Sequence, residues 1–352
     1  MSGGIGFYVH HHGRGHANRT QQIVAHLDRH VTVFGSSLQH FCPPHDRVEN
    51  VSLPSDVISP LPESNPWPDI FHYAPLGVPG IRERMFRLAQ WAYDTQPSLL
   101  VVDVSVEVTL FARLLSIPTV IVRQNGLRDD LPHQAAFQSS SGLLAPYPAM
   151  LEDETTPDWV RTKTYYAGGF SRYGQRELTT EAARAQVGMR LHRNHVVVMN
   201  GLGGEGNPMD SIVGAARTCP QWDWWVVGPT VGEQSDTPAN IMVVGRVEDT
   251  FPYLRGADVV VGSAGNNTVM EVATAGTPYI CIPEDRPFQE QREKAKALDR
   301  IGAACVLPSW PEPDDWEPLL EQTKHKDTQL LSNIIDPEGA ANCARYLEQF
   351  LD

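Results

Sequence analysis

The sequence predicts an α/β protein with two Rossmann-like domains facing a central cleft. Short apolar runs rich in β-branched residues recur along the chain. They are continuous rather than alternating, which is typical of strands buried on both faces of a parallel sheet. Helix-like stretches separate many of these runs. Each half of the chain also begins with a strand, a glycine-rich loop and a helix, over residues 5–28 and 195–218, which predicts two similar domains.

The expected elements alternate along the chain. Strands are predicted where the apolar runs lie, at residues 5–9, 31–34, 99–103, 119–122, 195–199, 224–227, 241–244, 258–262 and 279–282. Helices are predicted at residues 17–28, 81–95, 105–116, 181–191, 208–218, 266–275, 289–301 and 338–350.

The series of strands is interrupted in the middle of the chain. Residues 123–194 contain no convincing buried strand except a short one near 164–169, so we place the domain boundary near residue 170. The expected domains are an N-terminal Rossmann-like domain over residues 1–170 and a C-terminal Rossmann-like domain over residues 171–337. Residues 338–352 form a closing helix, and we expect it to pack back on the N-terminal domain.

Composition and charge narrow the class of protein. The 352 residues exceed the roughly 250–300 that one core usually serves, in agreement with two domains. The formal net charge of −14 argues against a nucleic acid partner and against a strong anionic-lipid surface. Any bound phosphate must therefore be held by local devices: glycine loops, helix N-termini or a few placed cations. Five scattered cysteines without C-x-x-C spacing, and no export signal, predict a reducing, cytoplasmic setting.

The first motif is the glycine–histidine loop after the first predicted strand. Gly13 and Gly15 allow close backbone approach to a ligand, and His16 begins the following helix, where ligands sit in open α/β sheets. A histidine there suits proton transfer near neutral pH. The alternative is a surface histidine at a helix start, with Arg19 in an ordinary surface pair. A metal tract at residues 10–12 is disfavoured, because successive strand side chains point to opposite faces.

The second motif is a glycine-rich loop at residues 200–207, between a strand and a helix. It contains Gly201, Gly203 and Gly204 but lacks the Lys-Ser/Thr of a P-loop and the strict G-x-G-x-x-G spacing. The loop is interpreted as a place where the backbone approaches a phosphate. The alternative is a flexible strand–helix turn.

The third motif, residues 262–295, is the most informative. A strand runs into Ser263, and a helix is expected to open at Asn266 or Asn267, where Asn, Ser and Thr are good caps and an anion is favoured. Glu271 is the only charged residue within 266–275, so this carboxylate needs a partner. A ribose diol would satisfy both of its oxygens; the alternative is an ion pair with an arginine such as Arg246 or Arg286.

Residues 258–295 resemble the donor-binding signature of GT-B glycosyltransferases. The resemblance is strongest to the family of the peptidoglycan lipid N-acetylglucosaminyltransferase and related UDP-glycosyltransferases. The matching residues are Ser263, Gly265, Glu271, Ala275, Gly276, Pro278, Pro283 and Gln291. Residues 13–16 and 200–206 resemble the two glycine loops of that family, and residues 98–105 resemble an acceptor-domain strand that ends in Asp103. Residues 36–95 and 125–190 match weakly.

The resemblance implies a set of donor-binding residues. Glu271 would bind the ribose, and Arg246 and Val247 would lie beside the base. The start of the helix would bind the diphosphate, and the loop after Pro283 would face the donor sugar. The residues implied in these last two roles, together with the glycines of both loops, are Gly13, Gly15, Gly201, Gly203, Gly204, Ser263, Ala264, Gly265, Asn266, Asn267, Thr268, Gln289, Glu290 and Gln291. The family's pair of an acidic residue and a glutamine appears here as Glu290-Gln291.

The expected reaction is metal-independent and inverting hexosyl transfer from a nucleotide diphosphate sugar, most plausibly a UDP-sugar, to a hydroxyl acceptor. His16 is the candidate base, and Asp103 orients it or acts directly. No metal or other cofactor is expected, because helix dipoles and N–H groups can stabilise the leaving diphosphate and no D-x-D triplet is present.

The acceptor is expected to be a small molecule, a glycan or a lipid-linked sugar. Residues 65–91 are aromatic and carry Arg82, Arg84 and Arg87, so peripheral contact with the inner face of the membrane is one interpretation. The other is an amphipathic helix with its arginines in water. Two further functions remain open. A nucleotide-sugar hydrolase would carry the G-x-G-H-x-x-R spacing of residues 13–19, and a nucleotide-sugar-binding protein would not need His16.

Overall fold

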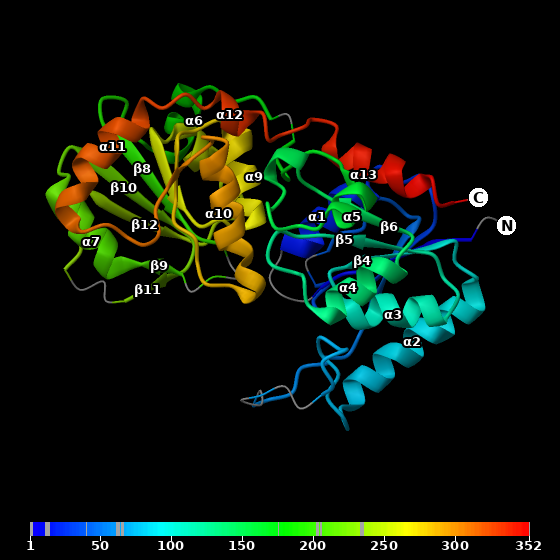
Figure 1. Ribbon diagram of the computed structural model, residues 1–352. Coiled ribbons are helices and arrows are strands. Elements are labelled where there is room, and N and C mark those ends of the chain that lie inside the picture. The colour runs from blue at the N-terminus through cyan, green and yellow to red at the C-terminus, as the bar shows by residue number, and fades with distance from the viewer. Residues whose placement is uncertain are drawn as a thin grey trace. The chain divides into compact units, whose positions relative to one another are not determined.

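The chain folds into two compact units. The computed structural model describes residues 3–10, 15–39, 41–60, 64, 67–174, 176–201, 204, 206–232 and 236–351. Unit 1 comprises Met1–Pro146, Glu154–Gly168 and Glu338–Asp352, and unit 2 comprises Tyr147–Asp153 and Gly169–Pro337. In each unit, helices flank a parallel sheet (Figure 1).

Unit 1 contains a seven-stranded sheet in the order β3-β2-β1-β4-β5-β6-β7, with all neighbours parallel. Ile5 pairs with both Val31 and Leu99, which places β1 between β2 and β4. All residues of β1, β2, β4, β5 and β6 are buried, which explains their continuous apolar sequences. The strands are β1 (Ile5–Tyr8), β2 (Val31–Gly35), β3 (Val48–Ser52), β4 (Leu99–Asp103), β5 (Thr119–Val122), β6 (Gly142–Ala145) and β7 (Thr164–Tyr166).

Helices cover the unit 1 sheet through short apolar faces. Tyr8, Phe34 and Val102 of the strands pack in one cluster with Leu88 of α2 and Ala112 of α3. The terminal helix α13 contacts α1, the helix that carries His16. The helices of unit 1 are α1 (Gly15–Val24), α2 (Pro79–Thr95), α3 (Val106–Leu114), α4 (Leu131–Ser139), α5 (Asp158–Lys163) and α13 (Gly339–Glu348).

Unit 2 contains a six-stranded parallel sheet in the order β12-β10-β8-β13-β14-β15. Val198 pairs with both Val226 and Val261, so β8 occupies the central place that β1 holds in unit 1. The strands are β8 (Asn194–Met199), β10 (Trp222–Val227), β12 (Ile241–Gly245), β13 (Val259–Gly262), β14 (Tyr279–Cys281) and β15 (Cys305–Val306). A separate parallel pair is formed by β9 (Asn207–Pro208) and β11 (Thr230–Val231).

Seven α-helices surround the sheet among the described residues of unit 2. Val196 and Trp224 of the strands pack against Ile212 of α7 and Trp316 of α11 in one fully buried cluster. The helices are α6 (Thr180–Val187), α7 (Met209–Thr218), α8 (Phe251–Gly256), α9 (Asn266–Ala275), α10 (Glu290–Arg300), α11 (Trp316–Lys324) and α12 (Gln329–Ser332). Three short 3₁₀ turns complete the chain: η1 (Ala149–Leu151), η2 (Pro287–Gln289) and η3 (Pro313–Asp315).

The predicted parallel α/β architecture is confirmed, with differences at the sheet edges and in the middle of the chain. The expectation of no strand in residues 123–194 beyond that near 164–169 is wrong, because β6 lies there and is fully buried. Its sequence, GLLA, is short and has no β-branched residue. The edge strand β3 was missed because its residues VENVS are largely exposed. No described helix is long and apolar enough to cross a membrane.

The strand orders locate the places where ligands bind. In both sheets the order reverses beside the first strand, between β1 and β4 in unit 1 and between β8 and β13 in unit 2. In open α/β sheets, ligands bind outside the carboxyl ends of the strands at such a reversal. Each unit therefore has one predicted binding edge, and the polar residues at each edge are candidate functional residues of that unit.

Candidate active site

A histidine, an aspartate and an arginine meet at the binding edge of unit 1. Asp103 is the last residue of β4, and His16 and Arg19 lie in the first turns of α1, which follows β1. The Nδ1 atom of His16 lies 2.6 Å from Asp103 Oδ2, and Arg19 Nη2 donates to Asp103 Oδ1 at 2.6 Å. The structure thus brings together the two residues proposed for catalysis. It also shows that Arg19 is buried against Asp103, so the alternative of an ordinary surface pair for Arg19 is wrong.

The contacts of His16 determine which of its nitrogens can act as a base. An ionised carboxylate only accepts hydrogen bonds, so Nδ1 must carry the proton that it shares with Asp103. Arg19 Nη2 also lies 3.2 Å from this nitrogen, but a guanidinium cannot donate to a nitrogen that already holds a proton. The assigned tautomer leaves Nε2 with its lone pair. The His16 side chain as a whole is 12% exposed.

Asp103 is kept ionised although it is almost completely buried. Burial alone would raise the pKa of its carboxyl group. The charges of Arg19 and then His16, and the hydrogen bond to His16, outweigh burial and hold the pKa of Asp103 well below its usual range. A permanently charged carboxylate behind an imidazole stabilises the imidazolium that forms when the base takes a proton.

The backbone just after Asp103 is strained. Val104 has φ = 55°, a left-handed conformation that a β-branched residue rarely adopts. The next residue, Ser105, begins α3 by accepting a hydrogen bond from the backbone N–H of Val108. Strain of this kind is concentrated at functional sites, where the surrounding structure enforces it. Here it forms the abrupt turn that ends β4 at Asp103.

The neighbouring histidines form no metal site in the described part of the chain. His10 lies against His16 with ring centroids 5.2 Å apart. His11, His12, Gly13 and Arg14 lie outside the described residues. Among the residues that are described, no group of three or more His, Cys, Asp or Glu side chains is arranged to hold a metal ion.

The binding edge of unit 2 is built around the start of α9. The helix opens at Asn266, as expected, but its N-cap residue is Gly265 and no side chain caps it. The prediction that Asn, Ser or Thr would cap this helix is therefore wrong. The first N–H groups of α9 are left without a side-chain acceptor, and such a helix end favours an anion.

The other predicted diphosphate ligands gather close to this helix end. Ser263 and Ala264 are buried in the turn between β13 and α9, and Asn267 is half-buried in the first helical turn. A Cβ on Gly201 would lie 3.7 Å from Thr268 Oγ1, so this glycine lies beside α9. A Cβ on Gly204 would lie 2.3 Å from Glu284 Oε1, so a larger residue there would require the Glu284 side chain to move. Gly203 lies outside the described residues.

Glu271, the residue assigned to the ribose, already has two protein partners. Arg172 Nε donates to Oε1 at 2.9 Å, and Thr250 Oγ1 donates to Oε2 at 2.9 Å. Burial raises the pKa of Glu271, and the Arg172 charge opposes that shift. The alternative of an ion pair with an arginine is therefore observed, but the partner is Arg172. The two suggested arginines are wrong: Arg246 is exposed after β12, and Arg286 bonds Glu284. Each carboxylate oxygen accepts one bond here, and an ionised oxygen accepts two.

The loop before α10 contains one buried and two accessible members of the predicted sugar-binding set. Gln291 is buried and holds Glu284 twice: its Oε1 accepts from the backbone N–H, and its Nε2 donates to Oε2 at 3.0 Å. Gln289 is exposed and Glu290 is half-buried. Phe288 and Gln289 both have φ above 50°, so this loop is strained as the turn after Asp103 is. Val247, assigned to the base, is half-buried.

The arginines expected on the surface of α2 are not equivalent. Arg84 is buried, with Nη1 3.0 Å from Asp56 Oδ2 and Nε donating to the Pro54 carbonyl at 2.8 Å. It also donates to the hydroxyl groups of Tyr8 and Ser36. Arg84 therefore holds the chain around residues 54–56 onto the core and takes no part in a basic surface. Both sequence-based interpretations place all three arginines of this segment on the surface, either facing a membrane or in water. For Arg84, both interpretations are wrong.

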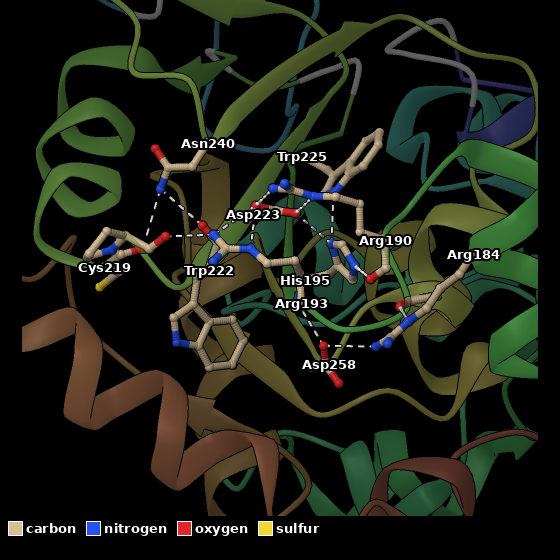
Figure 2. Close-up of polar contacts among 12 residues, drawn as sticks. Arg184, Arg190, Arg193, His195, Cys219, Trp222, Asp223, Trp225, Asn240 and Asp258 are labelled. Atoms are coloured by element: carbon tan, nitrogen blue, oxygen red, sulfur yellow. Dashed lines mark hydrogen bonds and ion pairs between the residues drawn. The ribbon is translucent and has the colours of Figure 1, made fainter.

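A second polar cluster lies at the opposite, amino edge of the unit 2 sheet, and Figure 2 shows its contacts. Asp223 accepts from Arg190 at 2.6 and 3.0 Å and from Arg193 at 3.1 and 3.2 Å. Trp225 donates to His195 Nδ1, and His195 Nε2 donates to the Arg190 carbonyl. Burial lowers the pKa of His195, so this imidazole stays neutral. Asp223, Arg190, Arg193, His195 and Trp225 each have a protein partner, as expected of a structural cluster.

Comparisons with known proteins agree with this arrangement. Residues 230–333 match the glycosyltransferase family 28 C-terminal domain. This match contains α9, the loop before α10 and most of the predicted donor-binding residues. The solved structure of the glycotransferase of kitacinnamycin superposes with a TM-score of 0.72, at 16% identity, and each chain is covered completely. The fold is that of the GT-B glycosyltransferases.

Two relatives illustrate the similarity in sequence. An uncharacterized glycosyltransferase of Methanosarcina acetivorans is 25% identical over 227 residues, which are 60% of this chain and 56% of that protein. The UDP-N-acetylglucosamine--N-acetylmuramyl-(pentapeptide) pyrophosphoryl-undecaprenol N-acetylglucosamine transferase of Caldicellulosiruptor saccharolyticus is 30% identical over 122 residues, 32% of this chain and 33% of that protein. The chain thus spans little more than half of the first relative. The resemblance predicted from the motifs is confirmed, and the comparisons agree on the glycosyltransferase class.

Proposed function

We propose that this protein transfers a sugar from a nucleotide diphosphate sugar, with UDP as the nucleotide, to a hydroxyl acceptor. The observation that carries the proposal is the hydrogen bond of 2.6 Å between His16 Nδ1 and the ionised Asp103, at the binding edge of the first sheet. This bond leaves Nε2 of His16 as a base beside the place where ligands bind in such sheets.

The proposed reaction is a single displacement with inversion at the anomeric carbon. His16 Nε2 takes the proton of the acceptor hydroxyl as its oxygen forms a bond to that carbon. The bond between the anomeric carbon and the diphosphate oxygen breaks, and the nucleoside diphosphate leaves with the electron pair. Asp103 stabilises the imidazolium throughout, and Arg19 keeps Asp103 in place. General base catalysis of this kind contributes about 10²–10⁴-fold to a rate.

The uncapped start of α9 supports the assignment of the leaving group. A departing diphosphate develops negative charge, and helix N–H groups stabilise such charge without reorganisation. Glu271 retains room for one more hydrogen bond on each oxygen, which fits a ribose diol. The Caldicellulosiruptor relative carries UDP-N-acetylglucosamine in its name, which favours UDP as the nucleotide. We propose that no metal ion is needed for this step.

The acceptor is proposed to be a lipid-linked or other hydroxyl-bearing molecule. The same relative is named for an undecaprenol-linked acceptor. In unit 1, exposed apolar side chains such as Leu76 and Phe86 lie in or just before α2. These residues give the acceptor part of the proposal its support, and contact with the inner face of a membrane belongs to the same proposal.

A product assay tests the proposed function. The wild-type protein is first screened with nucleoside diphosphates by thermal shift, where stabilisation by UDP is expected. UDP-sugars are then supplied with and without acceptors, and release of UDP and of free sugar is followed. Transfer that requires an acceptor is expected, and the His16→Ala variant should lose about 10²–10⁴-fold in turnover while still binding UDP. Full activity of His16→Ala would overturn the assignment of the base.

One observation favours a hydrolase as the second candidate. Arg19, the last residue of the G-x-G-H-x-x-R spacing, is part of the cluster and bonds the same carboxylate as His16. In a hydrolase, water would take the place of the acceptor hydroxyl at His16 Nε2. Rapid release of free sugar from a UDP-sugar without any acceptor would establish this function in place of transfer.

A further inference from the structure

A lysine side chain is buried directly behind the start of α9. Lys294 of α10 is 1% exposed and is among the largest fully buried side chains of the described chain. Its Nζ donates to Asn266 Oδ1 at 2.8 Å. Removing an ammonium group from water is costly, so the contacts that hold Lys294 here, the bond to Asn266 among them, must offset that cost.

The bond to Lys294 sets the orientation of the Asn266 side chain. An ammonium group only donates hydrogen bonds, so the oxygen of the amide must face it, and the amide NH₂ is directed away from Lys294. Asn266 is the first residue of α9 and is half-buried, so this amide belongs to the first turn of the helix, whose N–H groups are also donors. A buried positive charge and two kinds of donors therefore meet at one helix end.

A second, independent observation indicates a ligand with acceptor oxygens at this place. Ser263 is 1% exposed, and its hydroxyl group has no hydrogen-bond partner among the described residues. This hydroxyl lies 3.6 Å from the position of a Cβ on Gly265, the N-cap residue of α9. A buried hydroxyl without a partner is unfavourable, and a ligand oxygen that accepts its hydrogen bond would remove that cost.

The charges around this helix end are compatible with an anion. Gln291 Nε2 lies 3.8 Å from the position of a Cβ on Gly265, and it donates at 3.0 Å to Glu284, whose carboxylate also accepts from Arg286 at 3.1 Å. Burial raises the pKa of the Cys281 thiol to about 12, and the charge of Lys294 partly opposes that shift. The ammonium group therefore acts at the carboxyl end of β14, the edge where α9 begins.

We propose that Lys294 is a positioning residue for the donor diphosphate. It holds the Asn266 amide so that the NH₂ group faces the phosphate oxygens, and it adds a fixed positive charge behind α9. This inference rests on the proposed function, because it assigns the diphosphate of the same donor to this helix end. It adds a residue from α10 that neither the motifs nor the resemblance identified.

Calorimetric titration of the full-length protein with UDP and with uridine tests the inference. Lys294→Met removes the charge and nearly keeps the volume, and it should weaken UDP binding by about 10–100-fold, while uridine binding stays within about twofold. The matched control is Lys296→Met on the same helix, whose side chain is 69% exposed and pairs with Glu293. This control should change neither affinity by more than about twofold.

Asn266→Asp supplies a second variant in case the Lys294 variant does not fold. It keeps an acceptor for Lys294 but loses the NH₂ group, so it should also weaken UDP binding and leave uridine binding unchanged. In a double-mutant cycle the two changes should be non-additive, because they act through one group. Equal loss of UDP and uridine binding, or unchanged UDP binding in both variants, would overturn the inference. A wild-type protein that binds UDP no better than uridine would instead overturn the proposed function.

Discussion

The two binding edges of this protein share a topology but differ in how their polar groups are satisfied. In unit 1, His16, Asp103 and Arg19 bond one another without any substrate. In unit 2, α9 has no side-chain cap and the Ser263 hydroxyl has no described partner. A catalytic base must be held in one orientation before it reacts, whereas a binding site for a charged ligand must keep donors free. With the same sheet order, unit 1 holds its polar side chains in fixed mutual contacts, whereas unit 2 leaves hydrogen-bond donors without described partners.

The largest expected effects come from the two buried carboxylates, Asp103 and Asp223. Each is nearly inaccessible and paired with at least one arginine. Asp103→Ala leaves the buried Arg19 without its partner and should lower the free energy of unfolding by about 3–5 kcal/mol. Asp223→Ala should lower it by less, because Arg190 and Arg193 remain in contact with water. Only Asp103→Ala should also reduce turnover per folded molecule, because Asp223 lies at the opposite edge of its sheet. Chemical denaturation and activity assays on both variants check this.

An equal loss of turnover in Asp103→Ala and Asp223→Ala would contradict the assignment of catalysis to the unit 1 cluster. It would mean that both carboxylates serve stability alone. Matched expression levels and near-ultraviolet circular dichroism provide the control for folding in this pair.

A smaller effect is expected from acid, through His133 in unit 1. Burial and the neighbouring Arg128 lower the pKa of His133 to about 4, while Asp130 opposes the shift. The folded pKa lies below the unfolded value of about 6.5, so between these values the unfolded chain binds the extra proton. Stability should therefore decrease by about 1–3 kcal/mol as the pH falls from 7 to 4.5. Denaturation at several pH values should show a flatter profile for His133→Gln.

Hydrogen exchange measures the same effect locally in unit 1. Helix α4, which carries His133, should open more often at pH 5 than at neutral pH. A pH profile that is identical in the wild type and in His133→Gln would show that this imidazole does not titrate between the folded and unfolded states as expected.

The smallest expected change in stability concerns Ser263. It also tests most directly whether the binding edge of unit 2 has an unsatisfied donor. Its buried hydroxyl has no described partner, so Ser263→Ala should raise the free energy of unfolding by about 1 kcal/mol in the absence of ligand. The same variant should bind UDP about tenfold more weakly, because the ligand loses a donor. Thermal unfolding with and without UDP measures both effects. A loss of stability in the ligand-free variant would show that the hydroxyl is already satisfied.

Local sequence signals predicted the fold and part of the site well. Continuous β-branched runs gave the central strands of both sheets, and a glycine loop before a helix indicated His16. Asp103 could be predicted because it ends a buried strand, and the reversal of strand order brings that end beside α1. The start of α9 at Asn266 was predicted from the same kind of signal.

Contacts between distant segments could not be predicted in this way. Arg172 and Glu271 are 99 residues apart, and Lys294 and Asn266 belong to different helices. Sequence patterns favour exposure for arginine and lysine, yet Arg84 and Lys294 are buried because tertiary contacts supply their partners. The periodicity of a sequence predicts which face of a helix or strand is apolar. It does not predict which charged side chains on different elements will form hydrogen bonds or ion pairs.

The division of unit 1 into three chain segments has a consequence for biosynthesis. Helix α13 belongs to unit 1 and packs on α1, although unit 2 is made almost entirely of residues between the two helices. On the ribosome, the residues of unit 2 all leave the exit tunnel before α13 does. Unit 2 can therefore fold while α1, which bears His16, still lacks the helix that packs on it. Nascent chains that stop before residue 338 would contain a complete unit 2 and an exposed apolar surface on unit 1, which makes them substrates for chaperones.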